Sequence, residues 1–147
     1  MQIRKMLAAF ISVVMMCSVV SVPAFAVDET QIVTDLVSPA YEYAMKTENY
    51  LTITSSNADC KSLCEGMAGV TQITVEHTLE KHWGLWIWSE VDGASWTKTV
   101  YSDTIRLSNT KSGLDSGTYR LKSVFTLKSS RGEPEIITIY SDEETVG

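Results

Sequence analysis

Hydrophobic and polar residues alternate with a period of two through most of the chain after Tyr50, which is the pattern of half-buried β-strands. The alternation is clearest over residues 70–81 and 119–127. Shorter runs of the same kind lie at 51–54, 58–65, 85–91, 96–101 with 104–107, and 135–140. Turn residues separate the runs at intervals of about 8–12 residues, a spacing typical of β-sandwiches. Among these turn signals, Asp92-Gly93 predicts a tight hairpin.

No stretch after residue 26 has a helical period long enough for a parallel βαβ unit. The pattern therefore predicts an all-β fold, a single antiparallel β-sandwich of about seven strands, immunoglobulin/fibronectin III-like. We place the β-sandwich domain at 48–141. An extended lead-in at 27–47, which could add an edge strand, precedes it, and an acidic tail follows at 142–147.

The amino terminus has the three parts of a secretory signal peptide. Arg4 and Lys5 are followed by a mostly apolar run, Leu7–Val20, and by the small-x-small triplet 24–26. This run is shorter than the roughly 20 residues of a membrane-spanning helix, which disfavours a retained anchor. We therefore expect residues 1–26 to form a cleaved signal helix. The mature protein is expected to be secreted and extracellular, with no membrane anchor after cleavage.

Cleavage makes the chain more acidic. The full sequence has 12 basic and 18 acidic residues, a formal charge of −6. Loss of Arg4 and Lys5 leaves 10 basic residues against the same 18 acidic ones, a charge of −8. This balance argues against nucleic acid and against anionic membrane surfaces as partners. It fits a freely diffusing monomer of one domain.

Two cysteines, Cys60 and Cys64, remain after cleavage. Export permits a disulfide between them. On one strand, however, residues four apart lie about 13 Å from each other, whereas the Cα atoms of a disulfide lie within about 7 Å. Because 58–65 alternates like a strand, we favour two free, buried thiols, and the disulfide stays open as the alternative. Two thiols alone are too few ligands for a metal site.

Residues 114–119 match the L-x-x-G-x-Y pattern of a tyrosine corner, with Leu114, Gly117 and Tyr119 at the defining positions. In this motif the tyrosine hydroxyl bonds back to a backbone group a few residues upstream. Gly117 is expected to take a positive φ, and Leu114 to fill the core. The alternative is an ordinary glycine turn before a strand.

Four tryptophans fall between positions 83 and 96. Trp86 and Trp88 would share one face of the strand 85–91, and Trp88 or Trp96 could fill the core. A sandwich exposes its outer faces, so we expect Trp83 or Trp86 to be partly exposed. Exposed tryptophan is favoured at interfaces, which makes Trp83 and Trp86 the candidate binding surface. Edge protection is the alternative.

Catalytic chemistry has little support. On a strand, His77 and His82 point to opposite faces because their separation is odd, so we expect a semi-buried His77, a solvated His82 and no shared metal ion. A nucleophile such as Cys60 or Cys64 could be paired with His77, but no oxyanion loop accompanies it. We expect no catalytic, metal or cofactor-binding residues, with a small secreted hydrolase as a remote alternative.

The region 50–140 resembles a family of small secreted proteins of unassigned function from Gram-positive, clostridia-like bacteria. The resemblance lies in a set of short motifs: Ala58-Asp59-Cys60, Val70-Thr71-Gln72-Ile73-Thr74-Val75, Leu79-Glu80-Lys81, Trp88 with Trp96, and Gly117-Thr118-Tyr119-Arg120. Cys64, Trp83 and Trp86 depart from the pattern. The resemblance implies a fibronectin type III or immunoglobulin-like sandwich and no catalytic residues.

The sequence thus favours a secreted, non-enzymatic module that binds a protein or cell-surface partner. The alternative is a carbohydrate-binding module in which Trp83 and Trp86 stack on a cell-surface glycan.

Overall fold

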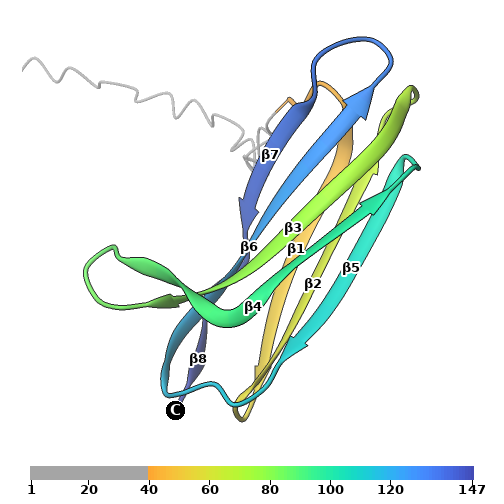
Figure 1. Ribbon diagram of the computed structural model, residues 1–147. Coiled ribbons are helices and arrows are strands. Elements are labelled where there is room, and N and C mark those ends of the chain that lie inside the picture. Colours follow the sequence, from red (N-terminus) through yellow and green to blue (C-terminus); the bar gives the residue numbers. More distant parts are fainter. Residues whose placement is uncertain (1–39) are drawn as a thin grey trace, which may run out of the picture. The chain divides into compact units, whose positions relative to one another are not determined.

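The computed structural model describes residues 40–147 (Figure 1). The predicted signal peptide 1–26 and the predicted lead-in up to residue 39 lie outside this part. The described chain is built of strands, and no helix in it has the length and apolarity of a membrane span. The strands are β1 (Ala44–Thr54), β2 (Asn57–Gly66), β3 (Val70–His82), β4 (Trp88–Val100), β5 (Thr104–Lys111), β6 (Gly117–Ser129), β7 (Glu135–Tyr140) and β8 (Glu144–Val146).

The strands form two antiparallel sheets, which confirms the predicted immunoglobulin/fibronectin III-like sandwich. One sheet has the order β1-β2-β5, and the other has the order β4-β3-β6-β7 with β8 also paired to β6. The chain changes sheets after β2, β4 and β5. The eighth strand arises because β7 pairs with 122–127 of β6 and β8 with 117–119. A single edge position of the sheet is thus filled by two short strands.

The predicted hairpin at Asp92-Gly93 is wrong, because β4 continues through these residues as a β-bulge. Ser95 pairs with Thr78 and Glu90 pairs with Glu80, so residues 91–94 lie opposite one residue of β3. Gly93 has a φ of +66°, a conformation that suits a bulge as well as a turn. The chain reverses instead at 101–103, and β5 extends to Lys111, beyond the predicted run 104–107.

Both ends of the predicted domain also extend further than expected. The lead-in provides the start of β1, where the Glu135 carboxylate accepts hydrogen bonds from the backbone N–H groups of Glu42, Tyr43 and Ala44 at 2.7, 2.7 and 3.2 Å. The acidic tail contributes β8, because Val146 is buried in the core. The apolar residue, and not the charge around it, decides the structure of this segment.

The core consists of two hydrophobic clusters with a polar layer between them. Along β3, Val75 belongs to one cluster and Leu79 to the other, with buried His77 between them. The same order recurs in β2, where Ser62 lies between Cys64 and Cys60. In β6, Ser123 separates Phe125 from Leu121 in the same way.

Hydrogen bonds across the interior join the two sheets at this layer. Asn49 pairs with Ser62 in one sheet, and His77 pairs with Ser123 in the other. Between the sheets, Ser62 Oγ lies 2.6 Å from His77 Nε2, and the Ser123 hydroxyl donates to Asn49 Oδ1 at 3.0 Å. The Asn49 amide also donates to the Leu121 carbonyl at 2.9 Å. These bonds partner polar groups whose burial would otherwise be costly.

Cys60 and Cys64 are both buried and free, as strand geometry predicts. Because they belong to different core clusters, the polar layer at Ser62 lies between them.

The tyrosine corner has the hydrogen bond that its motif predicts. The Tyr119 hydroxyl donates to the Asp115 carbonyl at 2.6 Å. Leu114 is buried, and its N–H donates to the Ser56 carbonyl at 3.0 Å. Gly117 has a φ of +154°. The connection from β5 to β6 is therefore fixed against the core by both a side chain and a backbone bond.

Two lysines form hydrogen bonds between β4 and β5, which are edge strands of different sheets. We call the line where these two strands meet the seam. Lys98 Nζ donates to the Arg106 carbonyl at 2.9 Å, and Lys111 Nζ donates to the Asp92 carbonyl at 2.8 Å. Each edge thus has a backbone acceptor that is satisfied by a side chain of the other.

Replacing Tyr119 with Phe should lower the free energy of unfolding by about 1–2 kcal/mol, because the bond to the Asp115 carbonyl is lost without a change in packing. Urea titration measures the loss. Tyr140→Phe is the matched control, since the Tyr140 hydroxyl has no hydrogen-bond partner in residues 40–147 and its loss should change stability little. Equal stability of Tyr119→Phe and the parent would contradict a stabilising corner.

Candidate functional site

The loop that joins β3 to β4, residues 83–87, carries several strongly exposed apolar side chains. It projects away from both sheets (Figure 1). The exposed fractions are 66% for Trp83, 79% for Leu85, 81% for Trp86 and 52% for Ile87. We call residues 83–87 the apolar tip. Exposed apolar side chains gathered at one place are characteristic of interaction sites.

The apolar tip is held in one backbone conformation. Trp83 N–H donates to the Ile87 carbonyl at 2.9 Å, and Ile87 N–H donates to the Gly84 carbonyl at 3.1 Å. His82 Nε2 lies 2.9 Å from the Leu85 carbonyl. Gly84 and Leu85 have φ values of +97° and +52°. The left-handed region suits Gly84 but strains Leu85, whose Cβ crowds the backbone there.

Stacked side chains support the base of the hairpin on the outer face of the larger sheet. The Arg120 guanidinium lies between Trp88 and Tyr140, 4.1 and 4.2 Å from the ring centres. Its Nε donates to Glu80 at 2.7 Å, and the His82 ring lies 4.8 Å from Trp88. Cation–π contacts of this kind stabilise by about 0.5–2 kcal/mol each. The ladder links β3, β4, β6 and β7 directly below the apolar tip.

The structure changes the predicted surroundings of the candidate tryptophans. Residues 85–87 belong to the loop, so Trp86 and Trp88 do not share a strand face. Trp88 lies under Arg120, and Trp96 packs against a core cluster. Trp83 and Trp86 are both exposed. Leu85 and Ile87, which the sequence analysis did not select, complete the apolar tip, and Gly84 was the one signal that a loop begins here.

A polar hollow of about 300 Å³ lies beside Trp83. Three segments form it: the end of β3, the bulge of β4 and the connection from β5 to β6. Its lining residues are Lys81, Trp83, Val91, Asp92, Lys111, Gly113, Leu114, Asp115 and Tyr119. Trp83 is thus shared between the apolar tip and the polar hollow, whereas Trp86 belongs to the tip alone.

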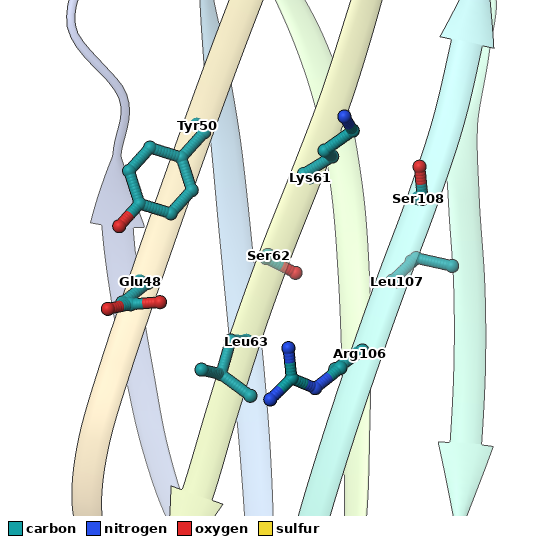
Figure 2. Close-up of a pocket in the computed structure, with 8 residues that line it drawn as sticks. All are labelled: Glu48, Tyr50, Lys61, Ser62, Leu63, Arg106, Leu107 and Ser108. Carbon is teal, nitrogen blue, oxygen red and sulfur yellow. The ribbon is translucent and has the colours of Figure 1, made fainter.

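A second hollow, of about 340 Å³, lies on the smaller sheet. Figure 2 shows Leu63 of β2 between Glu48 of β1 and Arg106 of β5, which are its partners on the neighbouring strands. Leu63 is buried although it faces away from the core. Glu48 is engaged by Lys46 at 2.8 Å, and this contact lowers the pKa of its carboxyl. The neighbouring long side chains thus cover an apolar spot on the sheet.

His77 is paired with Ser62, and neither thiol is its partner. A serine oxygen 2.6 Å from an imidazole has the spacing of a nucleophile and its base. Here both residues are buried between the sheets, so the pair acts as a tie between layers. Nδ1 of His77 and Oδ1 of Asn109 are buried without a hydrogen-bond partner in the described chain.

Burial fixes the protonation of the interior groups. It lowers the pKa of His77 to about 4, with the Asn109 side chain acting in the opposite direction, so the imidazole is neutral at pH 7. Burial also raises the pKa of Cys60 and of Cys64 to about 12. Because the thiolate is the reactive form, both cysteines are poor nucleophiles at neutral pH. No group of three or more His, Cys, Asp or Glu side chains in residues 40–147 could hold a metal ion.

Comparison with protein-family models finds no match, and comparison with curated proteins finds none either. Among solved structures, the chain is similar to OgpA from Akkermansia muciniphila, with a TM-score of 0.32 and 10% sequence identity. The match covers 68% of this chain and 29% of the OgpA chain. Function must therefore be argued from the apolar tip and the polar hollow themselves.

Acidification should destabilise the protein through His77. The unfolded imidazole has a pKa of about 6.5, whereas the folded one has a pKa of about 4. The unfolded chain therefore binds a proton first, and stability present above pH 6.5 is lost as the pH falls to 4, by about 3 kcal/mol. Urea titrations across this range should show a shallower loss in His77→Met. His82→Gln keeps the buried imidazole and should follow the parent, and equal slopes in His77→Met and the parent would contradict the assignment.

Proposed function

We propose that this chain is a secreted, non-enzymatic binding module that docks on an extracellular protein through the apolar tip. The observation that carries the proposal is the exposure of Trp83, Leu85, Trp86 and Ile87 on one ordered loop. Burying such a side chain fully in a partner is worth about 1.5–3 kcal/mol. A loop that already has its bound shape also loses little conformational entropy on binding.

The strain at Leu85 supports a role beyond folding. A leucine at a φ of +52° costs about 1–2 kcal/mol relative to a residue that tolerates this region, and its side chain returns no burial because it is 79% exposed. Strain of this kind is concentrated at functional sites. The leucine is therefore explained by a partner that covers it and not by the stability of the sandwich.

A protein partner fits the apolar tip better than a sugar or a lipid surface. Around Trp86, the neighbouring Leu85 and Ile87 offer no side-chain hydrogen bonds for sugar hydroxyls. The chain's acidic balance of 18 carboxylates against 12 basic residues disfavours anionic lipid. A convex apolar loop on a rigid base matches the anchors that fill pockets at the centre of protein interfaces.

Leu85→Asn should separate folding from binding. Asparagine tolerates the left-handed conformation, so the free energy of unfolding should stay equal or rise by up to about 1 kcal/mol, while partner binding falls. Thermal unfolding and a binding titration measure the two effects. A marked loss of stability in Leu85→Asn would show that the leucine serves the fold.

The partner can be identified with a photo-crosslinking amino acid placed at position 85 of the mature protein. We expect one protein of the cell envelope or culture medium to be linked there, and the link to weaken in Trp86→Ser. The same group at Tyr101, which is 86% exposed in the β4–β5 turn, is the matched control and should not link that protein. Equal linkage at both positions, or cosedimentation with lipid vesicles that needs Trp86, would overturn the proposal.

A further inference from the structure

The polar hollow shares Trp83 with the apolar tip, but its other lining residues have no part in the docking function, and its composition differs from that of the tip. Its walls come from the end of β3, the bulge of β4 and the β5–β6 connection. The geometry points to a second site, in which the polar hollow binds one neutral pyranose ring of a glycan stacked against Trp83. The inference does not require the protein partner proposed above, although both sites use Trp83.

Trp83 provides the aromatic wall of the site. Lys81 Nζ lies 5.0 Å from the centre of its ring and 5.6 Å from that of Tyr119. The ammonium therefore lies near the indole, and Trp83 has 66% of its surface exposed. The C–H face of a pyranose is apolar, and covering an exposed aromatic face with it removes apolar area from water.

The charges of the polar hollow favour a neutral ligand. Two ammonium groups, from Lys81 and Lys111, stand with two carboxylates, from Asp92 and Asp115, so the formal charge of the lining is zero. None of the four forms an ion pair within the described residues. Sugar hydroxyls both donate and accept hydrogen bonds, and they can use both signs of charge at once. A strongly charged ligand would meet attraction and repulsion together.

Hydrogen bonds hold two backbone segments of the walls in place. The Tyr119 hydroxyl holds the Asp115 carbonyl, and Lys111 holds the Asp92 carbonyl at the bulge. Gly117 leaves room for Lys81, because a Cβ at this glycine would lie 2.6 Å from the lysine Cε. Fixed walls reduce the ordering cost of binding. The bulge and the tyrosine corner are thus the two backbone features that form the site.

The test is a titration of the mature protein with cellotetraose, tetra-N-acetylchitotetraose, mannotetraose and, as a charged comparison, tetragalacturonate. Each is added up to about 10 mM, ten times the Kd of a ~1 mM site. The readout is the two-dimensional ¹H–¹⁵N NMR spectrum, in which the indole N–H of each tryptophan gives its own signal. We expect at least one neutral oligosaccharide to shift the Trp83 indole and the amides of Asp92 and Gly113. The Trp86 indole should not move.

Variants then assign the site. Trp83→Ala should weaken binding at least about tenfold, and Asp115→Asn should weaken it several-fold by removing a charge-assisted acceptor. Trp86→Ala is the matched control and should bind as the parent does. Three results would overturn the inference: no shift with any neutral oligosaccharide, binding of tetragalacturonate alone, or shifts that centre on Trp86. Crosslinking at position 85 reports on the protein partner separately, so failure of either proposal leaves the other readable.

Discussion

Two hydrogen bonds across the middle of the sandwich, one between Ser62 and His77 and one between Ser123 and Asn49, fix how one sheet lies on the other. A strand that slips by one residue turns its core face outward, but a slip of two residues keeps the apolar pattern intact. In this protein a slip of two would also carry a polar group out of the central layer and into a hydrophobic cluster. An unpaired buried polar group costs about 1–3 kcal/mol, so the polar layer specifies a register that apolar contacts alone would leave ambiguous.

The polar layer also divides the sandwich into two halves, and the bulge and the tyrosine corner both lie in one of them. The cluster around Ile73 and Phe125 is a core of ordinary sandwich type. The cluster around Leu79 and Tyr119 lies under the bulge and the tyrosine corner. Binding residues are often found on loops that a rigid scaffold holds in position.

Much of the fold was predictable because it depends on local alternation. The strands around 58–65, 70–81 and 119–127 and the corner at Tyr119 follow from period or motif. The position of His77 on the core face follows from the same period, but it was predicted to be semi-buried and is fully buried. The bulge was not predictable, since Asp92-Gly93 supplies a positive φ for a hairpin or a bulge alike. Residues 85–87 were predicted as the start of the strand 85–91 because aromatic and β-branched residues are enriched in strands, and such residues can equally occupy an exposed loop. Nor could sequence spacing show the polar hollow, which forms only when tertiary structure joins three distant segments.

The paired lysines at the seam bear on how copies of this molecule meet. Outer strands of a sandwich present unpaired backbone groups on which another chain can grow a cross-β ribbon. Here Lys98 and Lys111 donate hydrogen bonds to backbone carbonyls of the edge strands β5 and β4, and the bulge interrupts the regular pairing of β4. An unpaired strand edge beside the exposed apolar tip would favour aggregation. Two acceptors along these edges are thereby unavailable to another chain, which disfavours backbone pairing between copies of the molecule at this seam.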